Sequence, residues 1–251
     1  MQSDRPMRGD EVMNFEQLKI NIFADGADIE GMKQEYQKGY IKGFTTNPTL
    51  MKKAGVKDYV TFAKEALKAI PDLPLSLEVF ADDFETMEKE ADVISGLGEH
   101  VYVKIPITNT KGESSIPLIE RLSQKGIKLN VTAIMTLEQV KKTIAAFAPG
   151  TENIVSVFAG RIMDTGVDAK PLMKEVARLC KEKPGTHSLW ASCREVYNII
   201  EADECGTDII TVTNAILGKI PMIGKDLDQL SLETVQMFVN DGKSLGFSIL
   251  E

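Results

Sequence analysis

The sequence predicts a (β/α)8 (TIM) barrel, an α/β fold in a single domain, because eight short apolar runs alternate with segments of helical period along 251 residues. The apolar runs have the length of buried strands and lie at residues 18–25, 41–46, 73–80, 100–107, 127–134, 153–160, 187–192 and 208–214. Short connections indicate a parallel sheet, which a chain of this length closes naturally into a barrel. An open doubly wound sheet is the alternative, although no GxGxxG motif follows a strand. We expect the barrel and a C-terminal helix over residues 15–251, after a polar N-terminal tail at residues 1–14.

The segments between the strands carry apolar residues at helical spacing. In residues 85–97 the apolar positions on one helical face are Met87, Ala91, Ile94 and Leu97. In residues 136–148 they are Leu137, Val140, Ile144 and Phe147. Gly126, before the fifth run, is typical of the end of a helix. The last helix is expected within residues 226–243.

The composition excludes several classes of protein. Of the residues, 43% are hydrophobic and 26% are charged, and the formal net charge of −8 argues against a partner that is nucleic acid or an acidic membrane. No apolar run is long enough to span a membrane. The three cysteines form no CxxC pair, which favours a reducing, cytoplasmic setting. No cluster of histidines and cysteines has the spacing of a zinc site, so a metal cofactor is not expected.

Ten polar residues lie near the predicted carboxyl ends of the strands, where barrel enzymes carry their catalytic groups. They are Asp25, Asn47, Glu78, Lys104, Asn130, Thr132, Ser156, Arg161, Ser192 and Arg194. Four of these residues follow one another at intervals of 26 residues, and they are Glu78, Lys104, Asn130 and Ser156. These four residues are therefore expected at similar levels on successive strands.

Each of these residues also has an explanation without function. Asn47 followed by Pro48 is typical of the start of a helix. Glu78 and Lys104 would form a structural ion pair, the serines would fill small spaces in the barrel, and the arginines would lie on the surface. Several charged and polar groups in one buried layer are costly, however, unless they form a network or face a ligand. Their convergence therefore favours a site.

Lys104 lies in the middle of an apolar strand, where its amine has a chemical use. A lysine becomes nucleophilic when burial or a nearby cation lowers its pKa from about 10.4, and the neutral amine can attack a ketone and form a Schiff base. The carboxylates of Asp25 and Glu78 would then move protons. Asn130 and Thr132 would hold substrate hydroxyls or a water molecule.

The other end of the predicted site suits a phosphate. The guanidinium groups of Arg161 and Arg194 match the geometry of a phosphate group. Ser192 lies at the end of the seventh strand, which agrees with the place where barrels of this kind commonly bind phosphate. The residues therefore indicate carbonyl chemistry on a phosphorylated substrate.

These residues occur in stretches that together resemble the transaldolase family. The stretches are spread over most of the chain and read FADGAD (23–28), GFTTNPT (43–49), SLEVF (76–80), VYVKIPIT (101–108), LNVTAIMT (129–136), VSVFAGRIMD (155–164) and ASCRE (191–195). The chain is similar to the compact branch of the family, which includes the fructose-6-phosphate aldolases. The resemblance implies a barrel that acts on phosphosugars through a Schiff base with a dihydroxyacetone unit, without a cofactor. It also implies a homo-oligomer, either a pentamer or a decamer.

Matched motif by motif, the resemblance implies a role for each residue. Lys104 corresponds to the Schiff-base lysine, Asp25 to the acid/base carboxylate, and Glu78 to the carboxylate that works through water. The residues that correspond to substrate- and water-positioning groups are Asn47, Asn130, Thr132 and Ser156. Those that correspond to the phosphate grip are Arg161, Ser192 and Arg194. Cys193 is a departure, because many transaldolases have an aromatic residue at this position.

The resemblance implies a transaldolase of the pentose phosphate pathway, which moves dihydroxyacetone from sedoheptulose 7-phosphate or fructose 6-phosphate to an aldose phosphate. Aldolase members of the family tend to have Gln and Leu where this chain has Glu78 and Asn130, which favours the transferase. Two alternatives stay open. One is a lyase that releases dihydroxyacetone from fructose 6-phosphate, and the other is a phosphosugar-binding barrel that forms no Schiff base.

Overall fold

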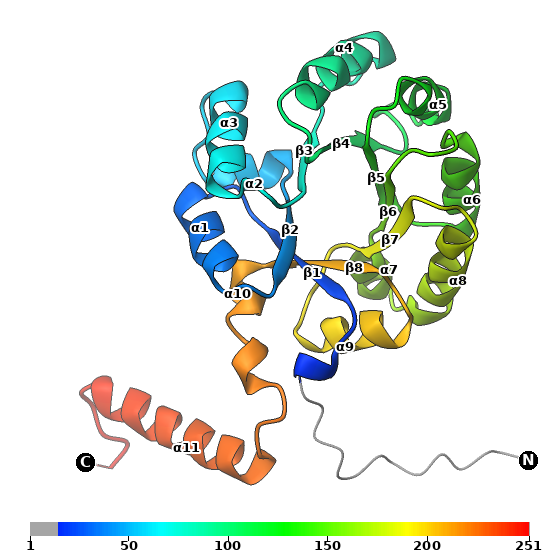
Figure 1. Cartoon of the computed structure of the whole chain (residues 1–251). Helices are drawn as coiled ribbons and strands as arrows, with labels where there is room; N and C mark the ends of the chain where they lie inside the picture. Colours follow the sequence, from blue (N-terminus) through cyan, green and yellow to red (C-terminus); the bar gives the residue numbers. More distant parts are fainter. Residues whose placement is uncertain (1–14, 251) are drawn as a thin grey trace, which may run out of the picture. The chain divides into compact units, whose positions relative to one another are not determined.

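Eight parallel strands form a closed barrel and follow one another in the order of the sequence (Figure 1). They are β1 Asn21–Asp25, β2 Ile41–Thr45, β3 Leu75–Glu78, β4 Val101–Pro106, β5 Leu129–Ile134, β6 Asn153–Val157, β7 Thr186–Trp190 and β8 Ile209–Thr213. Each strand overlaps its predicted run. β8 pairs with β1, with Asn21 opposite Ile209, so the sheet has no edge and the alternative of an open sheet is wrong. The predicted (β/α)8 barrel is confirmed.

The structure is a computed structural model that describes residues 15–250. The polar tail predicted at residues 1–14 lies outside the described residues. The chain divides into two units, and residues 19–218 form the unit that contains the barrel. The second unit comprises residues 15–18 and 219–250.

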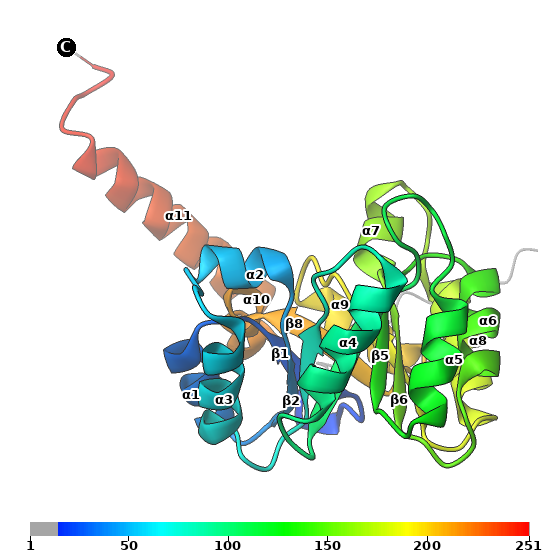
Figure 2. The same cartoon turned by 90° about the horizontal axis from the view of Figure 1, so that it is seen from above.

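Helices connect the strands, and the longer ones, among them α3, α4, α5, α6 and α8, surround the barrel (Figures 1 and 2). The helices of the barrel unit are α1 Ile29–Gln37, α2 Pro48–Lys53, α3 Tyr59–Ala69, α4 Phe84–Ser95, α5 Ile116–Gln124, α6 Leu137–Ala146, α7 Ala159–Asp164, α8 Lys170–Lys181, α9 Tyr197–Glu204 and α10 Asn214–Leu217. Because helices cover the outer face of the sheet, the strands are buried on both faces and read as nearly continuous apolar runs.

Local signals in the sequence set the ends of these helices. Asp83 caps α4, its carboxylate accepting the backbone N–H of Thr86 at 2.9 Å. α6 begins with a capping box, in which the side chains of Thr136 and Gln139 each accept the other residue's backbone N–H. Gly126 follows the end of α5 with a φ of +80°, which confirms its predicted place.

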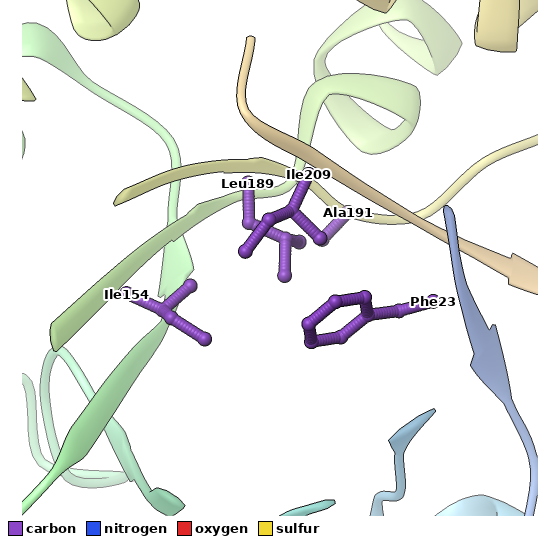
Figure 3. Packing of buried hydrophobic residues seen from close by; sticks show 5 residues of the cluster. All are labelled: Phe23, Ile154, Leu189, Ala191 and Ile209. Atoms are coloured by element: carbon purple, nitrogen blue, oxygen red, sulfur yellow. The ribbon is translucent and has the colours of Figure 1, made fainter. Parts of the chain in front are cut away.

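An apolar cluster fills part of the barrel interior (Figure 3). Its members are Phe23, Ile154, Leu189, Ala191 and Ile209. Figure 3 shows the Phe23 ring pointing from β1 across the interior toward Ile154. Gly43 on β2 makes room for this ring, because a β-carbon on Gly43 would lie 2.5 Å from it. The cluster closes the barrel from within, so the barrel is a packed core and not a pore.

Alternation along each strand then places polar side chains beyond this cluster. On β4, Val103 and Ile105 face the helices and are fully buried, whereas Tyr102 packs against the cluster and Lys104 follows it on the same face. Toward the carboxyl ends of the strands, the inward positions are occupied by Asp25, Thr45, Glu78, Lys104, Asn130, Ser156 and Thr211. The period of two therefore stacks a polar layer on an apolar one.

The second unit contains the helix that was predicted within residues 226–243. This helix, α11, spans Leu227–Ser244, and Asp226 caps it by accepting the backbone N–H of Gln229. Two short 3₁₀ turns complete the unit, η1 at Phe15–Gln17 and η2 at Ile220–Met222. Among residues 15–250, no helix combines the length and the apolar character that crossing a membrane requires.

Candidate active site

A cavity of about 400 Å³ lies at the carboxyl ends of the strands. All ten residues that the sequence analysis selected line this cavity, from Asp25 at the end of β1 to Arg194 after β7. Pro48, Ala133 and Phe158 line it as well. Within the described part of the chain, no three His, Cys, Asp or Glu side chains are grouped so that they could hold a metal ion.

Lys104 on β4 reaches this cavity with a side chain that is only 8% exposed. Its Nζ donates to the backbone carbonyl of Thr46 at 2.7 Å and lies 3.1 Å from Oε2 of Glu78. Glu78 stands opposite Lys104 in the register of β3 and β4, and its side chain is 17% exposed. A buried ammonium needs such partners, because an unpaired buried charge is costly. The ion pair considered in the sequence analysis is therefore present, and it faces the cavity.

Asn130 on β5 links the neighbouring strands through its side-chain amide. Its Nδ2 donates to Oγ of Ser76 on β3 at 3.0 Å, and its Oδ1 accepts from Oγ of Ser156 on β6 at 2.6 Å. All three side chains are buried. Since buried polar groups are stable only when they are paired, this network fixes the amide in one orientation.

Three of the four residues that are spaced 26 apart in the sequence lie opposite one another on adjacent strands. Glu78 pairs with Lys104, and Lys104 pairs with Asn130, as predicted. For Ser156 the prediction is wrong, because Asn130 pairs with Ile154 instead. The residue paired with Asn130 follows it by 24 residues, so Ser156 lies two residues further along β6 than the partner of Asn130. Ser156 still reaches Asn130, because both side chains point inward.

Asp25 is held at the end of β1 by two threonines. Oγ1 of Thr45 donates to Oδ1 of Asp25 at 2.7 Å, and Thr45 accepts in turn from Oγ1 of Thr211 on β8. Desolvation inside the barrel raises the pKa of the Asp25 carboxyl, although the charge of Lys104 and the hydrogen bond from Thr45 act in the opposite direction. A raised pKa makes the ionised Asp25 carboxylate a stronger proton acceptor than an ordinary aspartate.

Two further predicted residues differ in how they are held. Asn47 caps α2, since its Oδ1 accepts the backbone N–H of Leu50 at 2.9 Å and Pro48 is the first helical residue. The predicted helix start is confirmed, and Asn47 lines the cavity as well. Thr132 is buried, and its Oγ1 has no hydrogen-bond partner among the described residues. A buried hydroxyl of this kind beside a cavity is a natural contact for a ligand or a water molecule.

The two arginines approach the cavity from α7 and from the loop after β7. The guanidinium of Arg161 lies over the ring of Phe158, 5.7 Å from its centroid. Arg194 donates its backbone N–H to Oδ1 of Asn198 at 2.9 Å, and its guanidinium is bound to the carboxylate of Asp164. Both cationic groups are therefore held by neighbouring residues.

The backbone is strained beside the cavity. Outside glycine, two of the residues between 15 and 250 have a positive φ, Ala133 at 60° and Ser192 at 65°, and both line the cavity. Strain of this kind is typical of functional sites. Cys193 follows Ser192 and is buried, which raises the pKa of its thiol to about 12, and its Sγ donates to the carbonyl of Glu195. The thiol therefore fills space here and stays protonated.

Comparison with known proteins identifies the family. Residues 22–249 match the transaldolase/fructose-6-phosphate aldolase family. The chain belongs to this family. A "Probable transaldolase" from Methanococcus maripaludis strain C7 is 37% identical over 202 residues, which are 80% of this chain and 89% of that protein. One from Kosmotoga olearia is 35% identical over 216 residues, which are 84% of this chain and 94% of that protein.

The resemblance to the transaldolase family that the motifs indicated is thereby confirmed. A solved structure of 2,3-dimethylmalate lyase, a member of the PEP mutase/isocitrate lyase superfamily, is similar with a TM-score of 0.55 at 14% identity. The match covers 94% of this chain and 87% of that chain. At this identity the likeness shows the barrel fold alone.

Several residues of this candidate site were not predicted from the sequence. Thr45 and Thr211 are inward-facing polar residues at strand ends, so the rule that selected the other ten could have found them. Ser76 lies one layer deeper, and its partnership with Asn130 depends on how the strands are staggered. Asp164 is exposed on a short helix, and its contact with Arg194 depends on the path of a loop.

Proposed function

We propose that the chain is a class I transaldolase, which transfers a dihydroxyacetone unit from sedoheptulose 7-phosphate or fructose 6-phosphate to an aldose phosphate. The proposal depends above all on Lys104, a buried amine that faces a cavity and has two carboxyl groups near it. Membership in the family supports it.

The covalent steps follow from the chemistry of an amine and a ketone. The neutral amine of Lys104 attacks C2 of the ketose, and loss of water gives a protonated Schiff base. This imine draws electrons from the C3–C4 bond. When the C4 hydroxyl loses its proton, the bond breaks, the aldose phosphate leaves and an enamine remains on Lys104. The enamine then attacks the aldehyde of the acceptor, and the same steps in reverse release the new ketose.

The two carboxyl groups suit different proton transfers. Asp25, with its raised pKa, takes the proton of the C4 hydroxyl and returns it to the acceptor's oxygen. Glu78, beside Nζ of Lys104, serves the gain and loss of water at C2, with a water molecule as carrier. Thr132, whose hydroxyl has no partner among residues 15–250, positions that water.

The remaining polar groups orient the substrate. The amide groups of Asn47 and Asn130 and the hydroxyl of Ser156 face the sugar hydroxyls. The phosphate lies at the other side of the cavity, where Arg161, Ser192 and Arg194 bind it. A substrate fixed at its phosphate and at its reacting carbon is oriented for cleavage between them.

Reductive trapping tests the Schiff base. Borohydride added with fructose 6-phosphate reduces the imine, so the enzyme should lose activity only when both are present, and peptide mapping should locate the adduct on Lys104. Lys104→Arg should give no adduct and no turnover, because guanidinium stays protonated. Lys128→Arg is a control, since Lys128 lies over the Tyr102 ring and is not part of the cavity lining. An adduct on another lysine, or none, would refute the mechanism.

We also propose that the protein is a homo-oligomer, a pentamer or a decamer, of the cytoplasm, and that it acts in the pentose phosphate pathway. Large exposed apolar side chains on α11 support association with further copies, and they are Leu227, Leu232, Val235, Met237, Phe238 and Val239. Three free cysteines suit a reducing compartment. Sedimentation should give five or ten times the mass of one chain, and Phe238→Glu should lower that mass. A monomeric wild type would refute the assembly.

A further inference from the structure

The guanidinium of Arg194 is held along one edge by the carboxylate of Asp164. Nε of Arg194 lies 3.2 and 3.0 Å from the two oxygens of Asp164, and Nη2 donates to the same carboxylate. Asp164 is the last residue of α7, the short helix that also carries Arg161. A single helix therefore supplies one arginine of the cavity and the group that holds the other.

Stability of the fold does not account for this pair. The side chains of Arg194 and Asp164 are 48% and 51% exposed, and exposed ion pairs contribute little to the free energy of unfolding. The pair nevertheless completes the fixation of Arg194, because Asn198 already binds its backbone N–H at 2.9 Å. The backbone N–H and the guanidinium of Arg194 are thus both bound, which an isolated surface arginine does not need.

We propose that Asp164 is a positioning residue for phosphate binding, which orients the guanidinium of Arg194 before the substrate arrives. This inference rests on the proposed function of the site. A guanidinium group has five N–H donors in a rigid plane. Asp164 occupies the edge formed by Nε and Nη2, which leaves the edge that includes Nη1 to form paired hydrogen bonds with a phosphate.

Two effects of the Asp164 charge oppose each other. The hydrogen bond from Arg194 lowers the pKa of Asp164, so this carboxylate is charged at neutral pH and repels a phosphate. Water and salt screen this repulsion because the carboxylate is exposed. Without Asp164, in contrast, the free energy of ordering the Arg194 side chain would be lost from every binding event. We expect the ordering effect to be the larger one.

The test compares phosphorylated and unphosphorylated acceptors in Asp164→Asn. With saturating fructose 6-phosphate, the KM for D-erythrose 4-phosphate should rise about 2- to 10-fold, the range that corresponds to ordering one long side chain. The KM for D-erythrose and the kcat with either acceptor should stay unchanged. Glu175→Gln is a matched control, since Glu175 binds Nε and Nη2 of Arg178 in the same way on α8, outside the cavity lining.

Binding of inorganic phosphate, followed by calorimetry, separates this inference from the proposed function. Its dissociation constant should rise by the same 2- to 10-fold in Asp164→Asn and stay unchanged in Glu175→Gln. A wild type that binds phosphate but transfers no dihydroxyacetone would refute the proposed function and leave this comparison valid. Tighter phosphate binding in Asp164→Asn, or equal changes for both acceptors, would overturn the positioning role.

Discussion

Gly160 at the start of α7 touches the carbonyl oxygen of Ser192 so closely that a β-carbon on Gly160 would lie 1.7 Å from it. Ser192 has a φ of +65°, a conformation that a residue with a side chain seldom adopts. The close approach at Gly160 and the backbone strain at Ser192 are related, because the loop after β7 can follow this path only beside a glycine. The positions of Ser192 and Arg194 at the cavity therefore depend on Gly160.

Substitution of this glycine should displace the loop. In Gly160→Ala we expect weaker binding of phosphorylated substrates and a free energy of unfolding lower by about 1–3 kcal/mol, the usual cost of overpacking. Chemical denaturation and the KM for erythrose 4-phosphate measure the two effects. Gly242→Ala is the control, since a β-carbon there meets nothing within 4 Å and a helix favours alanine. An unchanged KM in Gly160→Ala would show that the loop keeps its place without this contact.

The sequence predicted the barrel and ten residues of its cavity because both depend on local patterns. Eight apolar runs indicate eight strands, and polar residues at the ends of such runs converge once the sheet closes. The network around Asn130 also needs the register of β5 against β6, which places Ser156 two residues beyond its predicted level. The contact of Asp164 with Arg194 needs the path of the loop after β7, and no periodicity in the sequence encodes that path.

Asp25 should make the protein less stable at neutral pH than a neutral residue in its place. The native state holds the proton of Asp25 more tightly than the unfolded state does, because burial raises its pKa above 3.8. At a pH above the pKa that Asp25 has in the folded state, its ionisation therefore lowers the free energy of unfolding. This penalty disappears as the pH falls to the pKa that Asp25 has in the unfolded chain. Asp25→Asn should raise the Tm at pH 7, and the gain should shrink toward pH 4.

The control for this measurement is an aspartate whose pKa is shifted in the opposite direction. The backbone N–H of Thr86 lowers the pKa of Asp83 at the cap of α4, so ionised Asp83 stabilises the fold. Asp83→Asn, which keeps a capping side chain, should give no rise in Tm at pH 7. A fall in Tm on Asp25→Asn at pH 7 would mean that the attraction of Lys104 outweighs desolvation at this carboxyl.

Arg161 should contribute to binding only when the substrate has a phosphate. Loss of one charge-assisted hydrogen bond costs about 1.5–3 kcal/mol, so Arg161→Gln should bind a phosphosugar roughly 10- to 150-fold more weakly. The KM for D-erythrose should change much less. Arg121→Gln is a suitable control, because Arg121 is a half-exposed arginine that binds Glu88 on α4. Equal losses for both acceptors in Arg161→Gln would indicate that Arg161 supports the fold.

Glu78 and Asn130 bear on whether the enzyme transfers dihydroxyacetone or releases it. After cleavage, dihydroxyacetone remains on Lys104 as an enamine. A lyase must protonate this enamine and hydrolyse the imine, whereas a transferase must keep it until an aldehyde arrives. Glu78 is paired with Lys104, and Asn130 is fixed by two serines, so both groups are held in place around the reacting carbon. With fructose 6-phosphate and erythrose 4-phosphate together, transfer should therefore far outpace release.

Glu78→Gln tests whether the transfer of dihydroxyacetone depends on a proton carried by Glu78. Glutamine fills the same space and can still accept a hydrogen bond from Lys104, but it cannot carry a proton. Transfer should slow about 10²- to 10⁴-fold, the usual contribution of a general acid or base, while circular dichroism shows an intact fold. The assay follows sedoheptulose 7-phosphate and free dihydroxyacetone in one reaction mixture. If dihydroxyacetone appears in the wild type as fast as the seven-carbon product, the protein is a lyase, and the amide and carboxylate around Lys104 do not protect the enamine.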